Sequence, residues 1–166
     1  MHAYQHQDAT ISLRDGLREY FRSDPKLIDP DALEQQGSKA ADLFRNHDVV
    51  HVVFGTDTSV RQEAMTDTWS MTGTDVGVGA YLSYLNEPLA IDIVREVGWI
   101  KVLGESLRAL PDMLEIWLRS RRMTKKWPWK DHDAWLDVPL AEIRQEFGIE
   151  VFQPRPVAAP SQPAKV

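Results

Sequence analysis

The chain has 166 residues and a net charge of −6, with 43% hydrophobic and 27% charged residues. These values are typical of one globular domain, and they argue against the broad basic surface of a nucleic-acid-binding protein. The chain has no cysteine, so any metal must be held by nitrogen and oxygen ligands. The sequence shows neither a signal peptide nor a run of about eighteen apolar residues. We therefore expect a cytoplasmic protein whose contact with the inner face of a membrane is peripheral.

The first part of the chain predicts three helices. Apolar side chains recur at helical spacing over residues 11–22. Pro30 suits the first position of a short helix that carries Leu33, because a helix does not need the N–H group that proline lacks there. The next helix either begins after a cap at Ser38 or continues the previous one, giving a single helix over residues 31–54.

A turn separates this helix from the next one. Residues 55–58 read Gly-Thr-Asp-Thr, and these residue types favour turns. Ser59 and Gln62 have the spacing of a capping box, which predicts a new helix from Val60 toward Met71.

The rest of the chain continues the helical pattern. The apolar spacing over residues 89–110 predicts a long amphipathic helix whose apolar stripe we expect to lie in the core, and Pro111 is expected to start another helix. Residues 138–149 predict a last helix that stops at a glycine. The fold class is therefore all-α, a single-domain helical bundle over residues 1–152, followed by a proline-rich, disordered tail over residues 153–166.

The sequence His-Asp-Val-Val-His begins at His47, and eleven residues separate His51 from Glu63. On a helix, His47 and His51 share one face, and Asp48 lies within about 100° of both. If the next helix runs back around a turn centred on Asp57, Glu63 lies opposite His51. The apolar neighbours indicate a buried helix, where unpaired carboxylates are costly and a metal ion can neutralise two of them. The sequence therefore predicts a metal site formed by His47, Asp48, His51 and Glu63.

Zinc suits two imidazoles and two carboxylates, and iron and manganese also accept these ligands. The same hairpin geometry places Asp67 opposite His47. We hypothesise that Asp67 accepts a hydrogen bond from the ring nitrogen of His47 that does not bind the metal. The alternative is a solvated surface carboxylate.

A second cluster lies near the C-terminal end of the chain. Residues 119–130 hold six of the nineteen basic residues and no acidic residue. Basic residues with neighbouring tryptophans suit anionic lipid head groups or a prenyl phosphate, while the alternative is a solvated helix end whose tryptophans cap the core. The expected lipid or membrane contacts are Arg121, Arg122, Lys125, Lys126, Trp127 and Trp129. Residues 130–133 are interpreted as a charged loop.

The metal-site residues resemble the signature of the coenzyme Q biosynthesis protein 4 family, which is HDxxH followed by eleven residues and Glu. The matching positions are His47, Asp48, His51, Gly55 and Glu63, and the similarity continues through residues 73–81 and 140–149. The amino-terminal region is short for the family, and Gln62 replaces a common Gly. The resemblance implies an all-helical protein that holds zinc on the matched His, Asp and Glu residues. It also implies a role in ubiquinone biosynthesis at a membrane, with polyprenylated intermediates as ligands.

Two functions remain open at this point. In the first, the protein removes the ring carboxylate of a polyprenylated hydroxybenzoate-derived precursor, with Asp48 or Glu63 available to carry a proton. In the second, the zinc is structural, and the protein is a lipid-binding scaffold for other ubiquinone-biosynthesis proteins. Expected partners are the polyprenylated precursor or a prenyl phosphate, the membrane surface and a second copy in a homodimer, but no nucleic acid. A metal-dependent phosphohydrolase is a weaker third reading.

Overall fold

The computed structural model describes residues 1–35, 40–84, 92 and 95–154, and in these ranges the chain is all-α, as the sequence predicts. The helices are η1 (Ala3–Gln5), α1 (Leu13–Ser23), α2 (Pro30–Gln35), α3 (Ala41–Phe54), α4 (Val60–Gly73), α5 (Val78–Tyr84), α7 (Trp99–Ser120), η2 (Asp133–Trp135) and α8 (Leu140–Phe147). No strand occurs among these residues, which contain two isolated β-bridges. The expected cap at Ser38 and residues 155–166 of the expected tail lie outside the described ranges.

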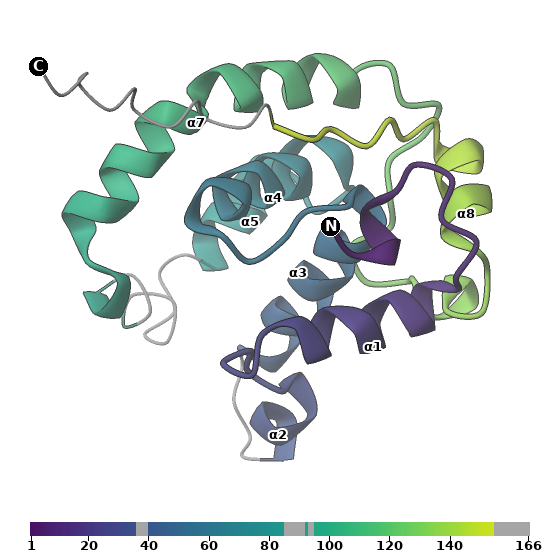
Figure 1. Cartoon of the computed structure of the whole chain (residues 1–166), viewed down its shortest axis with the longest axis horizontal. Helices are drawn as coiled ribbons and strands as arrows, with labels where there is room; N and C mark the ends of the chain where they lie inside the picture. The colour runs from purple at the N-terminus through teal and green to yellow at the C-terminus, as the bar shows by residue number, and fades with distance from the viewer. Residues whose placement is uncertain (36–39, 85–91, 93–94, 155–166) are drawn as a thin grey trace, which may run out of the picture.

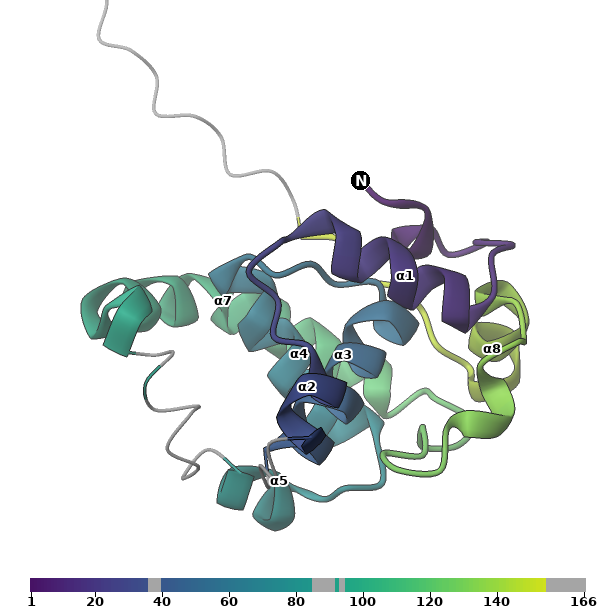
Figure 2. The same ribbon diagram turned by 90° about the horizontal axis from the view of Figure 1, so that it is seen from below.

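Helix α3 is the centre of the fold (Figure 1). It contacts α1, α2, α4 and α8, while α4 also contacts α5 and α7. The two ribbon views agree that α7 runs beside α4 and that its N-terminal half projects beyond the other helices (Figure 2). The α3–α4 pair, which carries the predicted metal residues, is therefore covered by helices on several sides.

The sequence of α3 explains its central position. Every residue from Val49 to Phe54 is buried, and a helix that is apolar on all sides must be covered by other elements. The helix ends at Gly55, whose φ of 75° lies in the left-handed region that glycine adopts without strain. The Gly55 N–H donates to the carbonyl of His51 and closes the last turn. The buried histidine is thus held at the C-terminal end of a rigid helix.

Arg144 of α8 is fully buried and joins α8 to the end of α3. Its guanidinium donates to the carbonyls of Val53 at 2.9 Å and Val52 at 3.0 Å, and these are among the last four carbonyls of α3, which have no partner within the helix. It also donates to the carbonyls of Tyr4, at 2.6 Å, and His6. Burial lowers the pKa of Arg144 to about 10. One cation therefore satisfies carbonyls from two segments that are far apart in the sequence.

Helix α7 differs from the sequence expectation in two ways. It begins after Gly98 and continues through Pro111, so Pro111 does not start a new helix. The apolar stripe is not in the core, because Leu103, Leu107 and Leu114 are each about 60% exposed. An amphipathic pattern shows which residues share a face but not whether another element covers it. Part of the expected helix, residues 89–91 and 93–94, lies outside the described ranges.

Candidate metal centre

The turn between α3 and α4 brings His47, His51 and Glu63 together. Ser59 precedes α4, but its side chain makes no capping bond. Gln62 instead bonds Asp57: its amide donates to Oδ2 at 2.6 Å, and its carbonyl accepts from the Asp57 N–H at 3.1 Å. This pair stabilises the turn, and Glu63 then lies on the first turn of α4, facing α3.

Three possible ligand atoms meet between the two helices. The Nε2 atom of His51 lies 3.3 Å from Oε2 of Glu63, and Nε2 of His47 lies 4.0 Å from the same oxygen. One ligand atom from each of these residues fits within 4.8 Å of the other two. Imidazole nitrogen and carboxylate oxygen are ligands that zinc, iron and manganese accept. The three residues could therefore hold one metal ion.

The hydroxyl groups of two threonines orient the ring of His51. Thr66 Oγ1 donates its hydrogen to the carbonyl of Gln62 at 2.9 Å, so it can only accept from its other neighbours. Thr56 Oγ1, at 2.7 Å, then donates to Thr66 and must itself accept from Nδ1 of His51, which lies 3.1 Å away. This order of donors places the proton of a neutral His51 on Nδ1.

The same order leaves a lone pair on Nε2 of His51. This atom is buried and has no hydrogen-bond partner among the described residues, and it faces the carboxylate of Glu63. Two acceptors 3.3 Å apart repel each other unless a cation lies between them. The donor set and this orphaned nitrogen thus fit a metal ion.

Asp67, one turn after Glu63 on α4, lies beside His47. Its Oδ1 is 3.4 Å from Nε2 of His47 and accepts a hydrogen bond from the Tyr81 hydroxyl at 2.6 Å. The hypothesis from the sequence concerned the ring nitrogen that does not bind the metal, but Asp67 approaches the same nitrogen that faces Glu63. Burial disfavours the charged form of Asp67, yet His47 and Tyr81 outweigh it and lower the pKa of Asp67.

His47 sits among negative charges. Burial lowers its pKa, but the hydrogen bond to Asp67 and the charges of Glu63, Asp67 and Asp48 outweigh burial and raise the pKa to about 9. The side chains of Glu63 and Asp67 are each about two-fifths exposed, whereas that of His47 is mostly buried. The site therefore favours positive charge, whether a proton or a metal ion carries it.

Asp48 does not join the three ligand atoms, which corrects the four-ligand expectation. The helix rotation of about 100° per residue turns Asp48 toward α1, where Oδ1 accepts from the Tyr20 hydroxyl at 3.1 Å. Burial raises the pKa of Asp48 to about 6, although His47, His51 and Tyr20 act in the other direction. The ring of Tyr20 also stacks on His51, with the ring centres 5.1 Å apart.

The expected lipid contacts at residues 121–129 are corrected in part. Trp127 and Trp129 are 0% and 2% exposed, so these indoles belong to the core and do not reach a membrane. Lys126 donates to the carbonyls of Thr72 and Ser120, and Lys125 pairs with Glu146 at 2.6 Å. Arg122 lies 3.5 Å from Glu150, and Arg121 lies over the ring of Trp117. Local acceptors thus engage most of this basic cluster.

The sequence interpretation missed four residues around the site: Tyr20, Thr56, Thr66 and Tyr81. Thr66 had a usable signal, because it lies three residues after Glu63 and so on the same face of α4. Thr56 lies in the predicted turn. Tyr20 and Tyr81 come from α1 and α5, and no local pattern links them to the histidines.

Comparisons with protein-family models, curated proteins and solved structures found no match for this chain. The resemblance to the coenzyme Q biosynthesis protein 4 family thus depends on the sequence motif alone. None of the described helices is both long and apolar enough to cross a membrane. The site must therefore be judged by its own geometry.

Proposed function

We propose that the protein binds one transition-metal ion, zinc by preference, at His47, His51 and Glu63. The observation that most directly supports this proposal is the buried Nε2 of His51, which faces Glu63 while the threonine hydroxyls hold the other ring nitrogen. Iron and manganese accept the same ligands. Three protein ligands resemble a catalytic zinc site, which keeps a position for water or substrate, more closely than a closed four-ligand structural site.

The proposed substrate class is a polyprenylated hydroxybenzoate-derived ring, and the proposed reaction is loss of its carboxylate. The motif from His47 to Glu63 supports this substrate class through its resemblance to the coenzyme Q biosynthesis protein 4 family. A bound ion would supply positive charge for the ring carboxylate. In the reaction, the bond between ring and carboxyl carbon breaks, carbon dioxide leaves, and a proton takes its place. The side chains of Glu63 and Asp67 are partly exposed, so water can deliver that proton beside the proposed ion.

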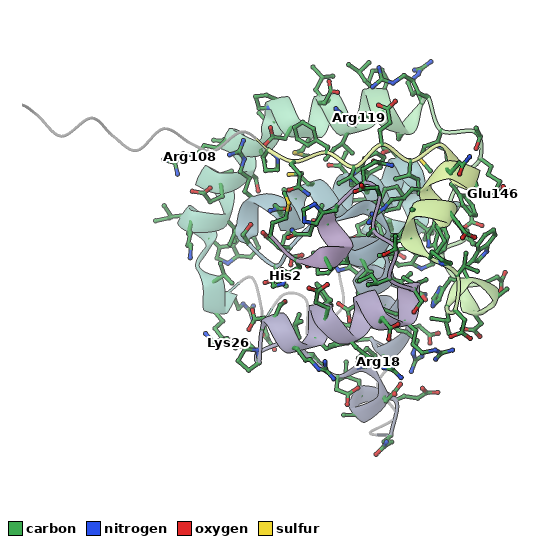
Figure 3. The ribbon with its side chains drawn as sticks, turned by 45° about the vertical axis from the view of Figure 1, so that its right-hand side comes forward. His2, Arg18, Lys26, Arg108, Arg119 and Glu146 are labelled. Carbon is green, nitrogen blue, oxygen red and sulfur yellow. The ribbon has the colours of Figure 1, made fainter. Side chains whose placement is uncertain are left out.

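The apolar stripe of α7 supports a peripheral site on a bilayer surface. Its exposed side chains are Trp99, Ile100, Leu103, Leu107, Leu110, Leu114, Trp117 and Leu118. At about 100° per residue, these eight lie within one arc of about 100°, and charged residues such as Arg108 and Arg119, labelled in Figure 3, fall outside it. A tryptophan near each end suits a helix lying in the interface plane.

Helix α7 also connects this surface to the metal centre. Arg61 of α4 and Asp112 of α7 form an ion pair at 2.6 Å with both side chains largely buried. Arg61 lies two residues before Glu63. The alternative scaffold function uses the same exposed surface of α7.

The experiment begins with the metal content of the purified chain, measured by mass spectrometry. We expect one ion per chain, retained by Asp48→Asn and lost by Glu63→Gln, because Asp48 faces α1. An equal loss in both variants would show that Asp48 is a ligand after all. No ion in the unaltered chain would refute the metal site.

Turnover is then tested with a prenylated hydroxybenzoate-type carboxylate in vesicles, by measuring released carbon dioxide under argon and under air. Release under both gases, lost in a folded His47→Ala variant, supports decarboxylation with protonation. Release under air alone points to an oxidative reaction in which dioxygen is the oxidant. Bound lipid and metal without carbon dioxide would favour the scaffold.

A further inference from the structure

Arg121 lies in line with the exposed apolar stripe of α7, one helical turn after its last members. Its backbone has helical φ and ψ values of −77° and −18°, and its N–H donates to the carbonyl of Trp117 at 3.3 Å. The helical path therefore continues through Arg121. At about 100° per residue, Arg121 falls inside the arc of the stripe, between the directions of Trp117 and Leu118. A positive charge thus lies at the C-terminal end of an otherwise apolar exposed surface.

The exposed guanidinium of Arg121 has no acidic partner among the described residues. It lies over the indole ring of Trp117, 5.0 Å from the ring centre, and makes no hydrogen bond with a described residue. This cation–π contact holds the arginine beside the stripe without neutralising its charge. The indole of Trp117 is itself exposed. The N–H donors of Arg121 are therefore available to an acceptor outside the chain.

The neighbouring basic residues differ from Arg121 because they have local partners. Arg119 lies 2.9 Å from Glu115, and Arg122 lies 3.5 Å from Glu150. At about 100° per residue, both arginines fall outside the arc of the stripe, on the charged side of α7, where Figure 3 labels Arg119. The two lysines that follow bond a glutamate or backbone carbonyls. Over residues 119–126, the described contacts thus leave Arg121 as the cation without a partner.

The position of this charge distinguishes between two covers for the stripe. The arc of the stripe carries no acidic residue, so a second copy packed stripe against stripe would bury Arg121 without a carboxylate, which is costly. On a bilayer, the long side chain can extend from the apolar region and keep its charge among phosphates and water. Trp117 beside it is also a residue type that suits the interface. Arg121 therefore favours a lipid surface.

We propose that α7 binds anionic phospholipid, and that Arg121 recognises the head group with its guanidinium on the phosphate. The planar fork of N–H donors matches phosphate oxygens. Phosphatidylcholine carries a choline charge that balances its phosphate, whereas an anionic head group leaves the negative charge for the arginine. One arginine near such a surface strengthens binding about fivefold. This inference rests on the bilayer contact proposed above and adds the lipid class and the residue that selects it.

The test measures binding of the full chain, by sedimentation, to vesicles of phosphatidylcholine alone and of phosphatidylcholine with phosphatidylglycerol. We expect the unaltered chain to bind the anionic vesicles about fivefold more tightly. Arg121→Gln should lose most of this preference and still bind phosphatidylcholine through the stripe. Arg121→Lys should lose less, because it keeps the charge but not the fork of donors. The metal content should be the same in all these chains.

Arg122→Gln is the matched control, because it removes the same charge from the neighbouring position, outside the arc and beside Glu150. Its preference for anionic vesicles should stay close to that of the unaltered chain. Equal losses in Arg121→Gln and Arg122→Gln would indicate a diffuse charge effect and overturn the role of Arg121.

Two further outcomes separate this inference from the bilayer contact on which it rests. Equal binding to both kinds of vesicle would overturn the choice of anionic lipid and leave the bilayer contact standing. Binding to neither kind would refute the bilayer contact itself. Displacement of the chain from anionic vesicles by soluble glycerol phosphate would identify a site for free phosphate esters, and the lipid assignment would then be wrong.

Discussion

The orientation of the His51 ring depends on the hydroxyl of Thr66. This hydroxyl lies 3.2 Å from Nδ1 of His51 and 2.7 Å from the hydroxyl of Thr56. Replacing Thr66 with Val keeps the shape but removes the oxygen that orders the donors. Loss of such a partner of a metal-binding histidine typically weakens metal affinity about 10–100-fold. We expect that loss in Thr66→Val, measured by competition with a chelator of known affinity.

Thr68 provides a matched control on the same helix. It is also buried, but its hydroxyl donates to the carbonyl of Ala64 within α4 and does not contact a histidine. Thr68→Val should therefore leave metal affinity nearly unchanged. Equal losses in both variants would show that the effect comes from α4 packing and not from the orientation of His51.

Residue patterns predict part of this site. The spacing of His47 and His51 and the turn between the helices are local, so they identify both histidines and Glu63 correctly as neighbours. The direction of Asp48 depends on Tyr20 of α1, which is 28 positions away in the sequence. A residue that lies between two ligands on a helix can turn to either side, and only the surrounding helices determine which side.

At the scale of elements, Arg144 is the main polar link between α8 and α3. Replacing it with Met leaves buried carbonyls without a donor, and each such group costs about 1–3 kcal/mol. We expect Arg144→Met to lower the free energy of unfolding by about 3 kcal/mol or more, measured by urea denaturation. Arg144→Lys should recover only part of this, because an ammonium group cannot reproduce the fork of donors.

Arg14 is the control for a charge that pairs at the surface. Its bond to Asp137 is 2.7 Å long, but both side chains are substantially exposed. Exposed ion pairs contribute little to stability, so Arg14→Met should have a small effect. A loss as large as that of Arg144→Met would contradict the special role of the buried guanidinium.

The exposed stripe of α7 leads to a prediction about vesicle binding. Leu107 is 58% exposed near the middle of the stripe, so Leu107→Glu should not reduce stability. We expect it to weaken binding to phosphatidylcholine vesicles containing anionic lipid about tenfold in a sedimentation assay, because it places a charge in the apolar arc.

Lys101→Gln is the comparison on the charged side of α7. It leaves the stripe intact and should weaken vesicle binding only slightly. If Leu107→Glu instead dissociates a homodimer and leaves vesicle binding unchanged, the stripe is an interface between two copies, and the membrane proposal is wrong.

The sequence predicted several helix ends correctly, but it was less successful in predicting which side chains are buried. Pro30, Gly55 and Gly148 mark ends that depend on the local backbone, and the structure confirms them. The exposure of Leu107 was predicted wrongly, and for Trp127 the lipid contact was wrong while the alternative of a place in the core was right. Both outcomes depend on which elements pack against these segments. A helix in the core and a helix on a membrane surface have the same apolar periodicity, so the sequence of α7 does not distinguish the two.

At the scale of the whole molecule, a bound ion should contribute to stability. A ligand that binds only the folded chain at 100 times its Kd adds about 2.7 kcal/mol. For a chain of this size that corresponds to a Tm change of roughly 5–10 °C. We expect a chelator to lower Tm by this amount and added zinc to restore it, with no response in Glu63→Gln. A chelator effect that persists in Glu63→Gln would place the ion elsewhere.

The pH dependence of stability should differ between the metal-free and metal-loaded chains. His47 has a pKa raised from 6.5 to about 9 in the fold without metal. Its protonation thus stabilises the metal-free chain fully below pH 6.5, and this contribution, on the order of 3 kcal/mol, is lost as pH rises toward 9. A metal ion requires the neutral ring, so proton competition weakens metal binding at low pH.

The two trends together predict that the Tm difference between the loaded and metal-free chains widens from pH 6.5 to 9. Scanning calorimetry of both forms across this range measures it. In metal-free His47→Gln, the Tm should fall much less between pH 6.5 and 9 than in the metal-free unaltered chain, because the titrating ring is absent. Parallel pH curves for the loaded and metal-free chains would contradict a site in which a proton and a metal ion compete for the same nitrogen of His47, between Glu63 and Asp67.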